Sequence, residues 1–318
     1  RAFGAEDVHV ADLEAVRTVL SGRSLIDSET LHFRSRKSVA QFLKLLCCDV
    51  KQEADRQRLL QILKQSAEHL RLQHGFQIPP EFEELSDPLL PFLWASSPGP
   101  LFRASLMLVK VAHVINHVDA RELRHQLAIS DSDLFALANE RVMKFGDMLR
   151  DTGVGVVILH ASEKPKQSTI LKLLAKRQTI AAQIHDRIRF RIIVNRRGDV
   201  LPSLLMMTRH LFPFNYILPN ESRNDLLSFA ELLEAMDRLH PGLDTVKDAI
   251  LRERTRPNIL FRNEFSHPDF LMINFVVDLP LRIDRFMDRG SPEIFSKYGK
   301  TVFLLVEFQV YDLATFQR

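Results

Sequence analysis

A glutamate stands in the middle of an apolar stretch, Val302–Tyr311, of this chain. If the stretch is a strand, its side chains alternate between two faces, which places Glu307, Gln309 and Tyr311 together and the valines on the opposite face. A carboxylate in such a strand is costly to bury unless a cation or hydrogen-bond donors satisfy it. Glu307 is therefore a candidate metal ligand or a candidate partner for a basic side chain.

A second stretch, Ile184–Val194, alternates in a similar way. Arg187, Arg189 and Arg191 share one face, and branched or aromatic apolar residues share the other. The planar guanidinium group suits phosphate, so this face is a candidate anion site. The same pattern is also expected of a solvated sheet face, or of ion pairs with Glu307 and with Asp278 on neighbouring strands.

Two more features complete the candidate site. Asp186 directly precedes the arginine strand and could act as a metal ligand if it lies before the regular strand begins. A third apolar stretch, Phe270–Leu279, predicts another strand. Upstream, a basic Ser/Thr-containing segment predicts the start of a helix, with basic side chains at Lys164, Lys166 and Lys172.

The order of these motifs resembles the synthetase domain of the RelA/SpoT family, the pyrophosphokinases that make guanosine tetra- and pentaphosphate alarmones. The resemblance rests on the basic helix start, on the Asp followed by the arginine strand, on the Asn-Tyr-Ile-x-Pro segment Asn215–Pro219 and on Val-Glu-Phe-Gln at 306–309. It spans Val154–Ala314, and the N-terminal half shows no such resemblance.

The resemblance implies roles for individual residues. Asp186 and Glu307 would bind Mg²⁺, and Glu307 would also be linked to activation of the acceptor hydroxyl. The family's Gly-Tyr-Gln-Ser-x-His stretch is absent, and its Arg-Thr after Glu-x-Gln-x reads Tyr311-Asp312 here. The remaining assignments are a phosphate-binding set of Lys164, Lys166, Lys172, Arg187, Arg189 and Arg191, and an acceptor side of Phe270, Asn274 and Gln309.

The activity that the resemblance implies is Mg²⁺-dependent transfer of pyrophosphate from ATP to the 3′-hydroxyl of a guanine nucleotide, as in the stringent response. Two alternatives remain open. The same chemistry could act on another acceptor, such as the 3′ end of tRNA. A catalytically silent nucleotide-binding or interaction module is the other alternative, favoured by the missing guanine-stacking motif.

Composition limits the class of protein. The chain has 318 residues, 46% of them hydrophobic, which is enough for a packed core. A net charge of +3 suits an anionic ligand. The two cysteines, Cys47 and Cys48, are adjacent, which excludes a disulfide scaffold and favours a cytoplasmic protein. The most apolar run, Leu101–Val118, contains Arg103 and Lys110 and predicts no membrane span.

Apolar periodicity and Pro/Gly breaks predict an α/β (α+β) protein, a nucleotidyltransferase-like mixed sheet with helices on one face, preceded by an all-helical N-terminal region. A proline-rich segment before residue 101 suggests the domain boundary. The predicted domains are 1–100, helical, and 101–318, nucleotidyltransferase-like with a helical insertion at about 220–262. Helices are expected at 5–20, 38–72, 101–125, 131–151, 202–212, 225–239 and 244–252, and a buried strand at 156–160.

Other candidate sites are weaker. His113 and His117 have a spacing that could bind zinc, but the Glu of a His-Glu-x-x-His motif is missing, so histidines on the surface or between helices are expected. Cys47 and Cys48 are expected to pack on an apolar helix face. The sequence contains no glycine-rich phosphate loop.

Overall fold

The structure, a computed structural model, describes residues 10–22, 26, 28–163, 167, 188–219, 221–227 and 271–317. The helices are α1 (Val10–Ser21), α2 (Arg36–Leu45), α3 (Glu53–His74), α4 (Pro80–Glu83), α5 (Leu90–Trp94), α6 (Phe102–Gln126), α7 (Asp131–Asp151), η4 (Arg197–Asp199), α9 (Val200–His210), η5 (Asp284–Arg289), α12 (Pro292–Tyr298) and α13 (Leu313–Phe316). The strands are β1 (Val156–Glu163), β2 (Ile188–Val194), β3 (Arg223–Asn224), β4 (Ile273–Arg282) and β5 (Thr301–Asp312).

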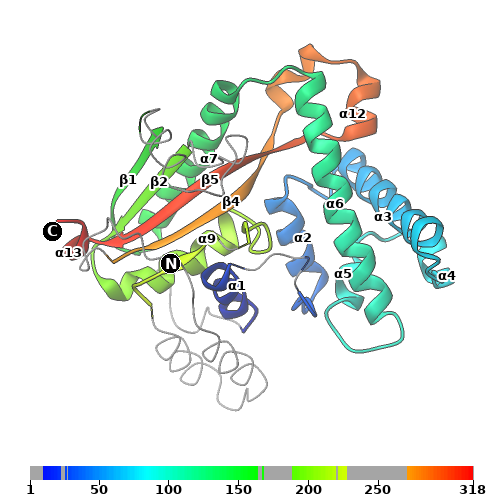
Figure 1. The fold of residues 1–318 in the computed structure, drawn as a ribbon, viewed down its shortest axis with the longest axis horizontal. Coiled ribbons are helices and arrows are strands. Elements are labelled where there is room, and N and C mark those ends of the chain that lie inside the picture. The colour runs from blue at the N-terminus through cyan, green and yellow to red at the C-terminus, as the bar shows by residue number, and fades with distance from the viewer. Residues whose placement is uncertain are drawn as a thin grey trace. The chain divides into compact units, whose positions relative to one another are not determined.

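The strands form one mixed sheet in the order β1-β2-β5-β4-β3 (Figure 1). β1 pairs with β2 in antiparallel fashion, β2 runs parallel to β5, and β3 is antiparallel to β4. Contacts between β4 and β5 join Met272 to Tyr311 and Ile283 to Lys300, so these two strands are also antiparallel. The mixed α/β class and the prediction that the three motif-bearing strands share one sheet are confirmed.

One face of this sheet is packed with aromatic rings. Phe308 of β5 lies 5.8 Å from Phe190 of β2 and 5.7 Å from Phe275 of β4, measured between ring centroids. Phe212, directly after α9, contacts both Phe275 and Phe308 at 5.6 Å. All four rings are buried. Together they bury several hundred Å² of apolar surface, which makes this face the main stabilising contact of the sheet.

α7 also packs on the aromatic face. A Cβ atom at Gly146 would lie only 2.3 Å from Cδ2 of Leu159 in β1, so this helix and strand are in close contact at the glycine. Leu159 is paired with Ile192, whose side chain belongs to the same face as Phe190. Helices α7 and α9 therefore cover one face of the sheet, as the sequence predicts, and the face that carries Glu307 is the other one.

The chain divides into two compact units that are discontinuous in sequence. One combines Arg1–Ser24, Asn139–Asp278 and Leu305–Arg318, and the other combines Leu25–Ala138 and Leu279–Leu304. The predicted boundary at residue 100 stays a prediction. In the first unit α1 packs against α9, where Nε of Arg209 donates to Asp12 at 2.7 Å.

The second unit is built around α6. Helices α3, α5 and α12 pack against it, and Arg58 of α3 forms an ion pair with Asp119 of α6. His117 of α6 stacks on Phe303 with ring centroids 4.3 Å apart, and His113 lies 4.5 Å from His117. Both histidines are half-buried, and the ring on which His117 stacks belongs to strand β5 and not to another helix. Burial, with a contribution from His117, lowers the pKa of His113 to about 3.

Several helix boundaries follow the sequence signals. α7 has its predicted bounds and begins at a capping box, because the hydroxyl of Ser130 accepts from the Asp133 N–H at 3.1 Å and Asp133 accepts from the Ser130 N–H at 3.1 Å. α6 is displaced by one residue from its predicted range, and α9 begins two residues early. None of the helices that the structure describes has the length and apolar character needed to cross a bilayer.

The helix predicted at 38–72 is wrong as a single element. It is two helices, α2 and α3, separated at Cys47, whose φ of 61° is left-handed and rare for a residue other than glycine. The prediction that both cysteines lie on an apolar helix face is also wrong, because they follow the end of α2 and are half-buried. Burial raises the pKa of the Cys48 thiol to about 12, so it packs as an uncharged side chain.

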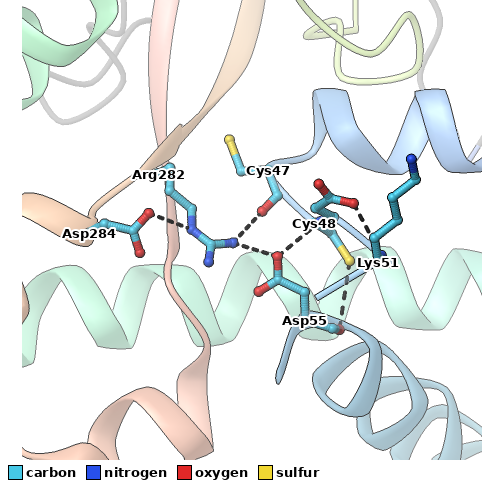
Figure 2. A network of polar contacts seen from close by, with 7 residues as sticks. Cys47, Cys48, Lys51, Asp55, Arg282 and Asp284 are labelled. Atoms are coloured by element: carbon cyan, nitrogen blue, oxygen red, sulfur yellow. Dashed lines mark hydrogen bonds and ion pairs between the residues drawn. The ribbon is translucent and has the colours of Figure 1, made fainter. Parts of the chain in front are cut away.

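A polar network fixes the turn between α2 and α3 (Figure 2). Nη1 of Arg282, at the end of β4, donates to the Cys47 carbonyl and to the Asp55 carboxylate, both at 2.7 Å. The same Asp55 oxygen accepts from the Asp49 N–H at 2.9 Å. Nε of Arg282 also donates to Asp284 at 3.0 Å. Arg282 thus satisfies a buried carboxylate and the carbonyl of the left-handed residue.

Replacing Arg282 with Met should therefore destabilise the protein by about 2–3 kcal/mol, below the full cost of breaking a buried ion pair because Arg282 is partly exposed. Denaturant unfolding measures this. The matched control is Arg121→Met, at an exposed arginine of α6, which should change stability by less than about 0.5 kcal/mol. Equal effects of the two substitutions would contradict the role of Arg282.

The lowered pKa of His113 predicts a pH dependence. The folded state excludes a proton that the unfolded chain binds below its ordinary pKa of 6.5, so stability is lost as the pH falls from 6.5 toward 3. His113→Gln should remove this loss. As the pH falls, the difference in unfolding free energy between this variant and the wild type should increase in favour of the variant by up to about 1.4 kcal/mol per pH unit. Exposed His125→Gln is the control. Parallel pH curves for wild type and His113→Gln would refute the prediction.

Candidate functional site

The face of the sheet opposite the aromatic rings carries a row of polar side chains, here called the polar face: Arg189 and Arg191 of β2, Asn274 of β4, and Glu307, Gln309 and Tyr311 of β5. The parallel register pairs Arg189 with Glu307 and Arg191 with Gln309. Paired residues of neighbouring strands project to the same side. The register therefore brings the arginines of one motif against the Glu-x-Gln of the other.

Glu307 is the centre of the polar face. The residue is 5% exposed, and both of its carboxylate oxygens have partners among the described residues. Nε of Arg189 donates to Oε2 at 2.8 Å, and Nη2 of the same guanidinium forms an ion pair with Oε2, also at 2.8 Å. Oε1 accepts from Nε2 of Gln309 at 3.0 Å and, in the orientation of Asn274 that satisfies its amide, from Nδ2 of Asn274 at 2.9 Å. The ion pair that the sequence left as an alternative is thus present.

A second set of contacts holds Arg191. Its Nε donates to Oε1 of Gln309 at 3.3 Å, and the same oxygen accepts from the Tyr311 hydroxyl at 2.8 Å. The Tyr311 hydroxyl also lies 3.4 Å from the sulfur of Met272. Burial raises the pKa of Tyr311 although Arg191 and Arg189 oppose the shift, so the phenol stays neutral and remains a donor. Gln309 therefore links Arg191 to Glu307 through one amide.

The antiparallel pairing of β1 extends the polar face toward the edge of the sheet. Ser162 is opposite Arg189 and His160 is opposite Arg191. His160 is exposed and Ser162 is half-buried, whereas Glu307 and Gln309 are buried. The polar face is therefore buried at β5 and more open at β1.

The structure brings together five of the predicted site residues, Arg189, Arg191, Asn274, Glu307 and Gln309. Asn274 contacts the β5 backbone as well, since its Nδ2 donates to the Phe308 carbonyl at 3.1 Å. Asp278, the other carboxylate considered for the arginines, lies on β4, where its N–H donates to the Tyr216 carbonyl at 2.8 Å. The remaining predicted residues lie outside the described residues: Lys164, Lys166, Lys172, Asp186, Arg187 and Phe270.

Tyr311 and Met272 were not among the predicted site residues. The signal for Tyr311 is present in the sequence, because alternation places it on the Glu307 face, but the resemblance assigns it no role and marks it only as a departure from the family's Arg. Its hydroxyl donates to Gln309, which makes it part of the same hydrogen-bonded row. Met272 precedes β4 and gives no signal in the sequence.

The described residues around Glu307 do not fit a metal ion. Mg²⁺ prefers oxygen ligands with free lone pairs, whereas both oxygens of Glu307 already accept from nitrogen donors. The fixed positive charge of Arg189 lies in contact with the carboxylate and would repel a divalent cation. No group of three or more His, Cys, Asp or Glu side chains within the described ranges could hold a metal ion.

No protein-family model matches the sequence, and no curated protein matches it. The fold is similar to solved structures of small alarmone synthetases. The crystal structure of small alarmone synthetase 1 from Bacillus subtilis has 13% sequence identity and a TM-score of 0.33, with 57% of this chain and 68% of that chain covered.

Two further structures from Bacillus subtilis are similar to the same degree. Small alarmone synthetase 1 bound to its product pppGpp has 12% identity and a TM-score of 0.33, covering 64% of this chain and 73% of that one. Small alarmone synthetase 2 has 12% identity and a TM-score of 0.31, covering 58% and 71%. At these identities and TM-scores, the similarity assigns no role to any residue of this chain.

The contacts of Glu307 predict how its loss affects stability. Glu307→Gln and Arg189→Met should each cost about 1.5–3 kcal/mol, the range for hydrogen bonds to charged groups. The double variant should cost less than the sum, with a coupling of about 1–3 kcal/mol, because each single variant already breaks the pair. Arg196→Met, at an exposed arginine after β2, is the control. A stabilising effect of Glu307→Gln would show that the carboxylate lacks a compensating partner.

Proposed function

We propose that the polar face binds the phosphates of a nucleotide and that the chain transfers pyrophosphate from ATP to the 3′-hydroxyl of a guanine nucleotide. One observation carries the proposal. Two motifs more than a hundred residues apart, the arginine strand and Glu-x-Gln, meet on one face of the sheet in direct register. This is the juxtaposition that the resemblance to the RelA/SpoT synthetase domain implies, and it leaves two arginines beside each other.

The charges of the polar face support an anionic ligand. Arg189 is neutralised by Glu307, but within the described part of the chain no carboxylate forms an ion pair with Arg191. Two guanidinium groups two residues apart on one strand repel each other, and a phosphate chain between them would offset that repulsion. Binding energy of this kind would orient the phosphates for in-line attack by an acceptor hydroxyl.

The acceptor would lie on the β4 side of the phosphates, near Asn274 and Gln309. Both amides are held by Glu307, so their orientation is fixed before the acceptor binds. The Mg²⁺ that the resemblance implies finds no site among the described residues near Glu307, and no step of the reaction is assigned to it. Lys164, Lys166, Lys172, Asp186, Arg187 and Phe270 remain proposed members of the site.

The test of the proposal is transfer of label. Pure protein incubated with γ-labelled ATP, Mg²⁺ and GDP or GTP should yield a labelled guanine nucleotide and AMP. Transfer of label to the 3′ end of tRNA, with no transfer to guanine nucleotides, would show that the acceptor is RNA and that the reaction is still pyrophosphate transfer from ATP. The absence of AMP with every acceptor would refute the proposed reaction.

A second function, nucleotide binding without catalysis, is favoured by one specific observation. Within the described part of the chain, side chains of Arg189 and Gln309 already engage both oxygens of the Glu307 carboxylate, so this residue is not poised to take a proton from an acceptor hydroxyl. ATP binding in the absence of transfer to any acceptor would decide for this second function.

Arg191 offers the sharpest binding prediction, because Glu307 does not neutralise it. Arg191→Ala should weaken ATP binding by about 1.5–3 kcal/mol, which calorimetry measures as about a 10-fold to 150-fold rise in Kd. The matched control Arg196→Ala removes the same charge from an exposed site and should change Kd by less than about 3-fold. Similar losses in the two variants would indicate a general charge effect and contradict a site at Arg191.

A further inference from the structure

We infer that the polar face is a metal-independent phosphate site, in which the guanidinium of Arg189 takes the place of a metal ion opposite Glu307. The inference rests on the proposed function for the choice of ligand class, the phosphate chain of a nucleotide or of an inorganic polyphosphate. The inference goes beyond the proposed function because it assigns Glu307 a role other than binding a metal ion or accepting a proton. Glu307 is a positioning residue that holds the guanidinium of Arg189 in place.

The saturation of Glu307 is the first step. A carboxylate offers about four lone-pair sites on its two oxygens. Here Oε2 accepts from Nε of Arg189 and forms an ion pair with Nη2, and Oε1 accepts from Gln309 and, in the orientation that satisfies the Asn274 amide, from Asn274. A divalent cation would have to displace the Arg189 guanidinium, which cannot lose its charge, and would leave it buried without its counter-ion. Glu307 is therefore closed to metal ions while Arg189 stays in place.

The unused donors of the arginines are the second step. A guanidinium has about five N–H donors in a planar fork. Among the described residues, Arg189 directs its Nε and Nη2 to Glu307, and Arg191 directs its Nε to Gln309 and also forms a hydrogen bond with Tyr311. Each side chain is thereby held in place, and its contacts with the described residues leave further N–H donors for a ligand. Fixed donors lose less entropy on binding than free ones, which suits a site for phosphate oxygens.

Net charge and access are the third step. Arg189, Arg191 and Glu307 contribute charges of +1, +1 and −1, a sum of +1, and the neutral phenol of Tyr311 adds none. The row is open at its β1 end, where the exposed His160 is opposite Arg191. A phosphate chain approaching from that end meets Arg191 first. The metal that usually neutralises such a ligand has no role at this position.

The test compares binding with and without metal. Calorimetry would titrate ATP, and separately inorganic tripolyphosphate, into wild-type protein in EDTA and in Mg²⁺, and would also titrate Mg²⁺ alone into wild type and Glu307→Gln. In EDTA both probes should bind with a Kd equal to or lower than that in Mg²⁺, because the metal neutralises phosphates that the arginines attract. Arg191→Met should raise the Kd in EDTA by about 10-fold or more, and Arg196→Met by less than about 3-fold.

Mg²⁺ alone should give no binding that Glu307→Gln removes. Such binding, or ATP binding that requires Mg²⁺, would overturn the inference and leave the proposed function standing. Metal-independent binding without transfer to any acceptor would support the inference and refute the proposed reaction. Failure of both probes under both conditions would overturn both. Equal affinity for the two probes supports recognition of the phosphate chain alone, and tighter ATP binding supports the same site with an added contact to the nucleoside.

Discussion

The contact between Arg189 and Glu307 determines the arrangement of the polar face. Because β2 and β5 run parallel with Arg189 beside Glu307, the two charges are taken out of water together when the sheet forms. A buried carboxylate with one free oxygen would still be costly, and Gln309 and Asn274 satisfy that oxygen. Gln309 in turn holds Arg191, so a single ion pair dictates the orientation of side chains on three strands.

The opposite face explains how a sheet can carry such a polar row. Alternation sends Phe190, Phe275 and Phe308 to the side where α7 and α9 pack, and their burial supplies the stabilisation that the polar side cannot. The two faces are coupled, because a shift of one residue in the register of β5 would turn Phe308 outward and Glu307 into the aromatic core. A register that preserves the aromatic core therefore keeps Glu307 on the face that carries Arg189.

Alternation is also why much of this arrangement could be predicted from the sequence. It places Arg189, Arg191, Glu307 and Gln309 on polar faces without any knowledge of the fold. It cannot supply the register between strands 118 residues apart, so the choice between a metal ligand and an ion pair stayed open until the pairing was known. The turn at Cys47 escaped prediction for another reason. Cys47 occupies the left-handed position after the end of α2, where its N–H donates to the Lys44 carbonyl and the Cys48 N–H donates to the Leu43 carbonyl. Glycine usually marks such a helix end, so a cysteine there gives no signal in the sequence.

A sequence motif therefore fixes where a carboxylate lies, while the residue across the strand pair fixes what it can do. With a small or apolar side chain opposite, Glu307 would be a buried anion in need of a cation, and a metal ion would be the simplest one available. With Arg189 opposite, that need is met by the chain itself, and the electrostatic preference of the face passes from cations to anions. Arg189, paired with Glu307, is therefore sufficient to change what a Val-Glu-Phe-Gln motif can bind, although the motif keeps its place in the sheet.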